Sequence, residues 1–210
     1  MSQVSKDQSG KVKYASKGKE RDNGFYLEHI VFLVDEVLFK VPEMLLTAES
    51  AFFRKLLKET NEEGHTDEKP IPLKDVEADE FRALLKCLLP SSLHGEPSSK
   101  KMSTSDWISV LKLSKRWEMT KTTQTAIQKV LEGLKADPIQ RILLAEQYGI
   151  SGWRLDAYAQ LASRREPLSA KEASSLGYER AFKIIHMRER AYEQIFSAGC
   201  DDCKKQRSVE

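Results

Sequence analysis

Two cysteines near the C-terminus, Cys200 and Cys203, have the spacing of half of a zinc site. A structural zinc site needs four ligands, but the sequence has neither a second such pair nor two histidines at zinc-finger spacing. Two such pairs could meet in a dimer, although nothing in the sequence requires it. We interpret the two thiols as an exposed, flexible pair. Because Lys204, Lys205 and Arg207 lie nearby and can lower thiol pKa values, oxidation of this pair is a hypothesis.

The sequence contains no motif for a catalytic nucleophile or a bound phosphate. It has no Gly-x-Ser-x-Gly turn. Gly18 and Lys19 are followed by Glu20, and no glycine stands at the upstream P-loop position. Cys87 stands in a leucine-rich helical stretch, which favours a buried and inert thiol. The sequence therefore predicts no enzymatic activity, no metal ion and no cofactor.

The composition is that of a folded chain. Of the 210 residues, 40% are hydrophobic and 31% are charged, which can support a hydrophobic core. The 34 lysines and arginines nearly balance the 32 aspartates and glutamates. Nucleic-acid binders usually carry a concentrated basic excess, because counterion release drives their affinity. We therefore expect no nucleic-acid partner.

Cysteine usage and the N-terminus indicate a compartment. Three cysteines are too few, and odd in number, for a disulfide framework, which favours a reducing intracellular environment. The N-terminus lacks the apolar stretch of a signal peptide, and no apolar run is long enough to cross a bilayer. We expect a soluble intracellular protein, cytoplasmic or nuclear, with no membrane partner.

Residues 1–24 are polar and lysine-rich, which predicts a disordered tail. The predicted helices and strands begin after this tail. The β-branched run Ile30–Val34 and the alternating run Val37–Val41 predict two strands joined by a tight turn. The turn lacks an Asn-Gly or Asp-Gly pair, so its geometry stays open. Pro42 has no N–H for a ladder hydrogen bond and is expected to end the second strand.

The middle of the chain alternates between helix and short strand. Residues 43–57 predict helix, with Ser50 as an N-cap inside this stretch. Prolines around Ile71 and Leu73 predict a short strand, either at the edge of a sheet or in a brief pairing. The apolar spacing of residues 75–89 predicts a helix that begins at Asp75 and is stopped by Pro90.

A polar loop is expected at residues 91–101, followed by two helices. Ser103 with Asp106 resembles a capping box, and Thr120 is expected to cap the second of these helices. Tryptophans stand at core-like helical positions and are interpreted as packing residues, although one could anchor a partner. They are Trp107, Trp117 and Trp153.

The last third of the chain is helical in pattern throughout. Asp137 followed by Pro138 predicts a helix start, and residues 169–172 form a capping box. Residues 197–210 are polar and predict a flexible C-terminus. Before them, a long amphipathic helix carries an apolar stripe. The stripe consists of Tyr178, Phe182, Ile185, Tyr192 and Phe196.

Five segments, in this order, resemble a known family. Residues 31–42 (VFLVDEVLFKVP) are similar to the opening of fungal BTB/POZ domains, and residues 50–53 (SAFF) resemble the pattern of the second helix in that family. Residues 67–73 and 81–85 resemble its third strand and third helix. Residues 107–119 resemble its closing helical pair. No single motif is diagnostic, so the order and spacing carry the resemblance.

The resemblance implies an α+β fold, in which helices flank a small BTB/POZ-like sheet and an all-α extension follows. It places the BTB/POZ-like domain at residues 25–134 and a helical extension at 135–196. Many animal members carry a His-Arg pair after the second strand, where this chain has Pro42 and Glu43. That departure fits the fungal branch of the family and puts inferences from animal transcription factors in doubt.

The resemblance also implies a scaffold for protein–protein interaction, which commonly forms homodimers through the first helix and the segment before it. Apolar residues of this region could form the dimer interface, or could simply complete the core of one chain. They are Leu27, Val31, Leu33, Met44 and Leu45. An adaptor for a cullin-type ubiquitin ligase is the alternative function. It is less favoured, because the apolar-x-Glu element of cullin-binding members has no clear match between Pro90 and Met102.

Overall fold

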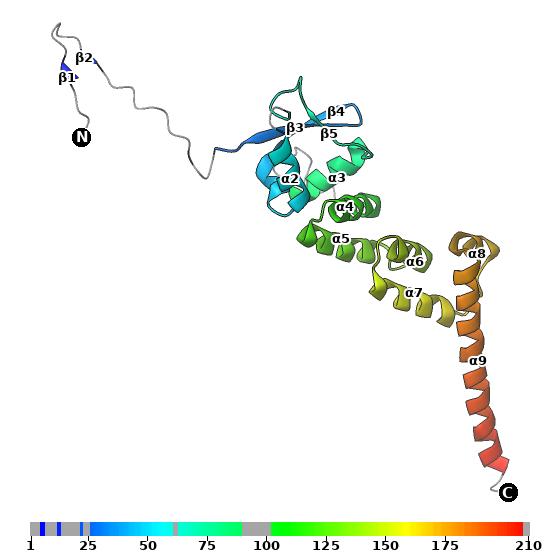
Figure 1. The fold of residues 1–210 in the computed structure, drawn as a ribbon. Coiled ribbons are helices and arrows are strands. Elements are labelled where there is room, and N and C mark those ends of the chain that lie inside the picture. The colour runs from blue at the N-terminus through cyan, green and yellow to red at the C-terminus, as the bar shows by residue number, and fades with distance from the viewer. Residues whose placement is uncertain are drawn as a thin grey trace.

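The computed structural model describes residues 5–6, 12–13, 22, 26–60, 63–89 and 102–207, with side chains as far as residue 194. The predicted tail at residues 1–24 and the predicted loop at residues 91–101 therefore lie largely or wholly outside the described residues. Within the former, two short strands, β1 (Ser5–Lys6) and β2 (Val12–Lys13), pair antiparallel. Figure 1 shows a small sheet followed by a succession of helices that ends in one long helix.

A tight hairpin supplies two of the three strands of the main sheet. Strand β3 (His29–Val34) pairs antiparallel with β4 (Val37–Pro42), as the alternating runs predict, and Pro42 is the last strand residue. The two turn residues, Asp35 and Glu36, have φ values of 50° and 59°. Of the two-residue turns that match the strand twist, type I′ has positive φ at both positions. The turn therefore has this geometry without the usual Asn-Gly pair.

The third strand, β5 (Ile71–Pro72), pairs parallel with β3 and gives the strand order β4-β3-β5. The edge position predicted from the prolines is confirmed, since an edge strand can leave one side of its backbone unpaired. Gly64 crosses close to this sheet and accepts a 2.8 Å hydrogen bond from the Val31 N–H. Its φ is +84°, and a Cβ would lie 2.8 Å from Ile71 Cδ1, so this position requires glycine.

Two short helices follow the hairpin, α1 (Glu43–Thr47) and α2 (Ala51–Glu59). The predicted N-cap is confirmed, because the Ser50 side chain accepts a hydrogen bond from the Phe53 N–H. Helix α3 (Ala78–Leu88) begins three residues later than expected. Asp75 has a φ of 57°, which excludes it from a right-handed helix, and Glu77 forms a capping box with Glu80 instead.

An antiparallel pair of helices, α4 (Thr104–Arg116) and α5 (Thr120–Gly133), closes this part of the chain. The capping box of Ser103 and Asp106 is confirmed. Thr120 is not a cap: it is the first residue of α5, and Met119 stands at the N-cap without a side-chain bond. The sequence placed the helix start within one residue but misassigned its cap.

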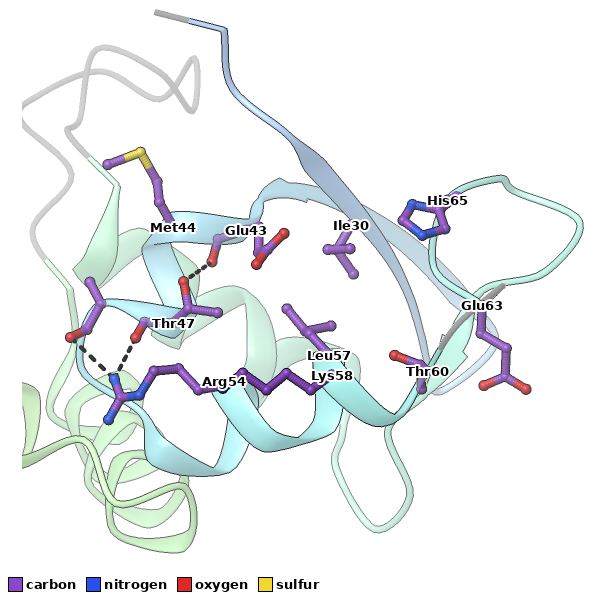
Figure 2. A pocket seen from close by; sticks show the side chains of 11 residues that line it. Ile30, Glu43, Met44, Thr47, Arg54, Leu57, Lys58, Thr60, Glu63 and His65 are labelled. Carbon is purple, nitrogen blue, oxygen red and sulfur yellow. Dashed lines mark hydrogen bonds between the residues drawn. The ribbon is translucent and has the colours of Figure 1, made fainter. Parts of the chain in front are cut away.

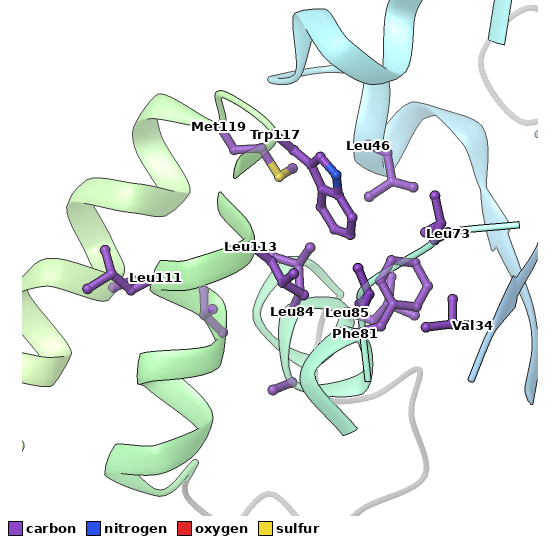
Figure 3. Packing of buried hydrophobic residues seen from close by; sticks show 14 of the residues in the cluster. Val34, Leu46, Leu73, Phe81, Leu84, Leu85, Leu111, Leu113, Trp117 and Met119 are labelled. Atoms are coloured by element: carbon purple, nitrogen blue, oxygen red, sulfur yellow. The ribbon is translucent and has the colours of Figure 1, made fainter. Parts of the chain in front are cut away.

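The core lies between the sheet and helices α2 to α5 (Figure 3). Phe32, Phe53, Phe81 and Trp117 are almost fully buried and meet edge to face, with ring centroids 4.8–5.9 Å apart. Such aromatic contacts add about 0.5–1.5 kcal/mol each beyond the burial of their area. Trp117 therefore packs in the core as predicted, as does Trp153, whereas Trp107 is only partly buried.

Four further helices form the extension: α6 (Pro138–Gln147), α7 (Ser151–Ser163), α8 (Ala170–Leu176) and α9 (Tyr178–Arg207). The predicted caps at Asp137 and Ser169 are confirmed. Leu144 and Trp153 belong to the same hydrophobic cluster as the core above, while Ile142, Leu161 and Ile184 belong to a second cluster. A few residues of α6 and α7 thus join the extension to the first unit through a shared hydrophobic cluster, and the α+β class with a helical extension is confirmed.

Helix α9 buries a different face from the one that its apolar stripe suggests. An amphipathic helix is expected to bury its apolar stripe, but Ala181, Ile184 and Arg188 are the buried residues of α9 among those with described side chains. Tyr178 and Phe182 of the stripe are exposed. The helix also continues through residue 196 to Arg207. Among the helices in the described part of the chain, none is both long and apolar enough to span a membrane.

Candidate interaction surface around the first helix

The segment before the hairpin lies beside the start of α1. The Glu43 N–H donates a 2.9 Å hydrogen bond to the Glu28 carbonyl oxygen, which extends the strand pairing by one step. Leu27 directly precedes Glu28 and Met44 directly follows Glu43, and the exposed fractions of these two side chains are 44% and 57%. Exposed apolar side chains at adjoining positions are a typical feature of a protein-binding surface.

The five predicted interface residues do not share this surface. Leu27 and Met44 are exposed and Leu45 is partly buried on α1. Val31 is only 1% exposed, so its side chain completes the core of this chain and offers no free area. Leu33 is partly buried on β3 opposite Leu38 of β4, away from α1. The structure therefore brings together Leu27, Met44 and Leu45, and separates Val31 and Leu33 from them.

A groove of about 420 Å³ opens next to Met44 (Figure 2). Its apolar wall is formed by Ile30 of β3, Leu57 of α2 and Met44 itself, and charged side chains such as Glu43 and Lys58 surround it. The remaining lining residues are Thr47, Ala48, Arg54, Thr60, Glu63 and His65. The sequence analysis missed this groove, because its residues come from four segments that only the fold brings together.

Hydrogen bonds hold the short helix α1 in place. The Arg54 guanidinium on α2 donates to the carbonyl oxygens of Thr47 and Ala48, at 2.5 and 3.5 Å. The last carbonyl groups of a helix have no partner within the helix, and a basic side chain can satisfy them. The Thr47 hydroxyl also donates to the Glu43 carbonyl oxygen at 3.1 Å. Met44 is therefore presented on a fixed turn of helix.

The corner between α1 and α2 is anchored to the closing helices. The Glu49 carboxylate accepts hydrogen bonds from the Thr122 N–H and hydroxyl, at 3.1 and 3.0 Å. Thr122 lies in the first turn of α5, where a negative charge also interacts favourably with the helix dipole. This contact, together with Ser50, fixes α1 and the groove relative to the core.

The described residues do not offer an alternative chemical site. Cys87 is partly buried, whereas the sequence favoured a buried thiol, and burial together with the nearby Glu49 carboxylate raises the pKa of this thiol. In the part of the chain with described side chains, no three His, Cys, Asp or Glu residues are grouped as metal ligands. Cys200 and Cys203 lie on α9, and their side chains fall outside this part.

A three-stranded sheet covered by helical pairs, with an exposed apolar groove beside its first helix, defines a small α+β module with the surface of an interaction domain. The family model of the BTB/POZ domain matches residues 19–133, more than half of the chain. The chain belongs to the BTB/POZ family, and its domain is a protein–protein interaction module. No curated protein matches the chain.

Proposed function

We propose that this chain is a non-enzymatic module that forms homodimers through the surface around α1. The observation that carries the proposal is the exposure of Met44, which lines the groove, and of Leu27, on the segment that pairs with the start of α1. In a two-fold dimer the same patch of both copies meets, so each apolar residue contributes twice. Tyr26 is also exposed and extends the patch along the same segment.

The composition of the patch fits a dimer contact. Burying one large apolar side chain stabilises a contact by about 1.5–3 kcal/mol, and a stable interface buries about 1,200–2,000 Å² in total. Leu27 and Met44 supply an apolar centre, and Glu43, Lys58 and Arg54 supply a charged border. This arrangement, an apolar centre with a polar rim, is common at protein–protein interfaces.

The test is self-association of the full chain, measured by light scattering over a wide dilution range. We expect Met44→Glu to shift the dilution curve to smaller species, because it places two like charges at the centre of the contact. Leu155→Glu is the matched control, since Leu155 is 77% exposed on α7, away from α1. An unchanged dilution curve for Met44→Glu, or an equal shift for both variants, would contradict the proposal.

The alternative, an adaptor for a cullin-type ubiquitin ligase, has no comparable observation in its favour. The sequence between Pro90 and Met102 lacks a clear apolar-x-Glu element. Most of that segment also lies outside the described residues. Direct binding to a cullin N-terminal domain that is abolished by Trp107→Ala, next to this segment, would reverse the preference.

Three further parts of the proposal rest on sequence reasoning. We assign residues 25–134 to the BTB/POZ domain and residues 135–196 to its extension, and we place the protein inside the cell, in cytoplasm or nucleus. The sparse, odd set of three cysteines and the unpaired thiol of Cys87 support a reducing compartment. The resemblance of residues 31–42 supports the fungal type of the family.

A further inference from the structure

Helix α9 carries an exposed apolar stripe with the spacing of a coiled coil. Tyr178, Phe182, Ile185 and Tyr192 are 82%, 47%, 44% and 49% exposed. Successive residues of the stripe are four, three and seven positions apart. Glu189 lies within the seven-residue interval, four positions after Ile185 and three before Tyr192, so it also falls on the stripe. In sequence, Phe196 and Cys203 continue the pattern. In a coiled coil, apolar residues at alternating intervals of four and three form one face of a helix, and this face packs against the same kind of face on a second helix. We call this face of α9 the seam.

The described part of the chain leaves this stripe largely uncovered, although the Arg188 guanidinium lies 6.0 Å from the centre of the Tyr192 ring. Ile184 belongs to the second hydrophobic cluster, and Ala181 and Arg188 are buried on the same face of α9, about a quarter of a turn from the stripe. Arg188 is the last buried residue of α9 among those with described side chains. More than half of this 30-residue helix lies beyond it, and Figure 1 shows that part running away from α7 and α8.

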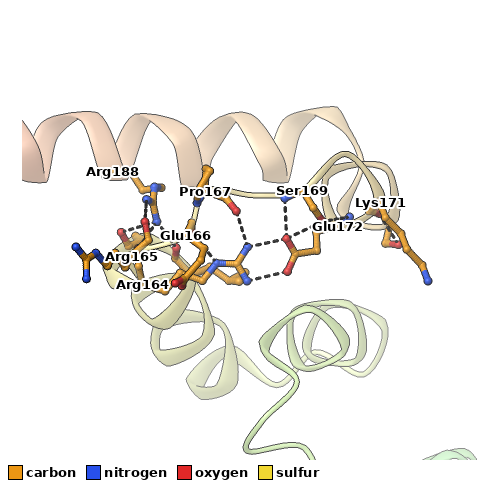
Figure 4. A network of polar contacts seen from close by, with 11 residues as sticks. Arg164, Arg165, Glu166, Pro167, Ser169, Lys171, Glu172 and Arg188 are labelled. Atoms are coloured by element: carbon orange, nitrogen blue, oxygen red, sulfur yellow. Dashed lines mark hydrogen bonds and ion pairs between the residues drawn. The ribbon is translucent and has the colours of Figure 1, made fainter.

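The rotation of α9 is fixed by Arg188, so the stripe stays exposed. Its guanidinium donates hydrogen bonds to the carbonyl oxygens of Leu161, Arg164 and Arg165 at the end of α7, at 3.2, 2.6 and 3.2 Å (Figure 4). These are the carbonyl groups that a helix end leaves without partners. The nearby ion pair between Arg164 and Glu172, at 2.6 Å, ties α8 to the same corner.

We propose that the stripe of α9 binds the α9 helix of a second copy of this chain, in an antiparallel pair. An isolated helix is only marginally stable in water unless a partner covers its apolar face. A second copy offers the same seam at the same spacing. This contact is separate from the surface around α1, so it goes beyond the proposed function.

The charge on Glu189 selects the antiparallel orientation. In a parallel, in-register pair, Glu189 lies opposite Glu189 of the second copy, and two carboxylates in a desolvated seam repel each other. In an antiparallel pair, residue 189 of one copy can lie opposite residue 192 of the other. The Tyr192 hydroxyl can then donate a hydrogen bond to the carboxylate, and the contact occurs twice by symmetry. The same register places residue 178 opposite residue 203.

The area of the seam is in the range of a specific contact. A fully buried aromatic side chain removes about 150–250 Å² from water. The three aromatic residues of the stripe are about half exposed or more, and together with Ile185 they therefore expose roughly 400 Å² of side-chain surface in each copy. Two copies give roughly 800 Å², to which the rest of a helix about 45 Å long adds. The total approaches the ~1,200 Å² at the lower end of stable interfaces.

The first test uses the full chain carrying Met44→Glu, so that the α1 surface does not contribute. We expect this variant to remain dimeric at micromolar concentration by light scattering, and Ile185→Glu added to it to give a monomer. Met187→Glu is the matched control, because Met187 is 42% exposed on the other side of α9 and should leave the dimer intact. A monomer with Met44→Glu alone overturns the α9 contact.

The two proposals fail in different ways. If Ile185→Glu alone makes the chain monomeric and Met44→Glu has no effect, the α1 surface is the one that fails. Orientation is tested by oxidation of Tyr178→Cys in a chain that also carries Cys200→Ser. The antiparallel pair predicts a disulfide-linked dimer that disappears with Cys203→Ser. A dimer that persists without Cys203 indicates the parallel pair and overturns the antiparallel one.

Discussion

The Ser50 hydroxyl donates a 2.6 Å hydrogen bond to the Trp117 carbonyl oxygen, 67 residues further along the chain. The Ser50 hydroxyl oxygen in turn accepts a 3.2 Å hydrogen bond from the Phe53 N–H and so caps α2. One buried hydroxyl therefore starts a helix and also ties that helix to the end of α4. Trp117 packs its ring on Phe53 at 4.8 Å between centroids, so the polar contact and the aromatic contact support each other.

Ser50→Ala should therefore cost more than the loss of an ordinary helix cap. An N-cap replaced by alanine costs about 0.5–2 kcal/mol, and the buried Trp117 carbonyl also loses its donor, at about 1–3 kcal/mol. We expect the free energy of unfolding to fall by roughly 2–4 kcal/mol, measured by urea denaturation. Ser175→Ala is the control, because Ser175 is exposed. A fall of less than 1 kcal/mol would show that the bond to Trp117 contributes little.

Gly64→Ala should destabilise the sheet. The new Cβ would lie 2.8 Å from Ile71 Cδ1, and the backbone has a φ of +84° that alanine adopts only with strain. We expect a loss of roughly 1–3 kcal/mol in the free energy of unfolding. Gly152→Ala is the contrasting variant, since its Cβ meets nothing within 4 Å and it lies in α7. Gly152→Ala should be neutral or stabilising by up to about 1 kcal/mol. A Gly64→Ala variant with a higher free energy of unfolding than Gly152→Ala would refute this account.

Arg188→Ala should loosen α9 without unfolding the first unit. It removes hydrogen bonds to carbonyl groups at the end of α7, and bonds to a charged group contribute about 1.5–3 kcal/mol each in favourable cases. We expect faster amide hydrogen exchange in α8 and α9, with unchanged exchange in β3 and α3. Arg190→Ala, at an exposed position of the same helix, is the control. Equal acceleration across the whole chain would show that the effect of Arg188 is not local.

Acid should weaken the corner at α8. The hydrogen bonds that Glu172 accepts from Arg164 and Ser169 lower its pKa from 4.5 to about 2. A carboxyl group with a lowered pKa in the folded state contributes stability that is fully present above its unfolded pKa and is lost as the pH falls towards the folded value. The loss should therefore occur between about pH 4.5 and pH 2. Glu172→Gln should lower stability at pH 7 and remove part of this acid dependence, measured by thermal unfolding across that range; an unchanged acid dependence would contradict the assignment.

Local signals in the sequence predicted most of the elements. The hairpin, the cap at Ser50, and the capping boxes at Ser103 and Ser169 depend on residues within a few positions of each other, so their physics is visible in the sequence. The order of these segments also indicates the BTB/POZ family, which the family model matches over residues 19–133. The prediction that a helix begins at Asp75 is wrong, because Asp75 has a left-handed φ where the Arg116 guanidinium of α4 donates to the carbonyl oxygens of Lys74 and Asp75, a contact that local sequence does not reveal.

The candidate sites depended on the tertiary structure. The sequence analysis proposed Leu27 and Met44 as interface residues, but it also proposed Val31, which the structure buries to 1% exposure on the central strand β3. It predicted the stripe of α9 but not which face the chain would bury. The hydrogen bonds of Arg188 determine which face of α9 is buried, and they form because the fold places the end of α7 within reach of its guanidinium. Spacing along a helix determines which residues share a face, whereas contacts between distant segments determine which face remains free to bind another protein.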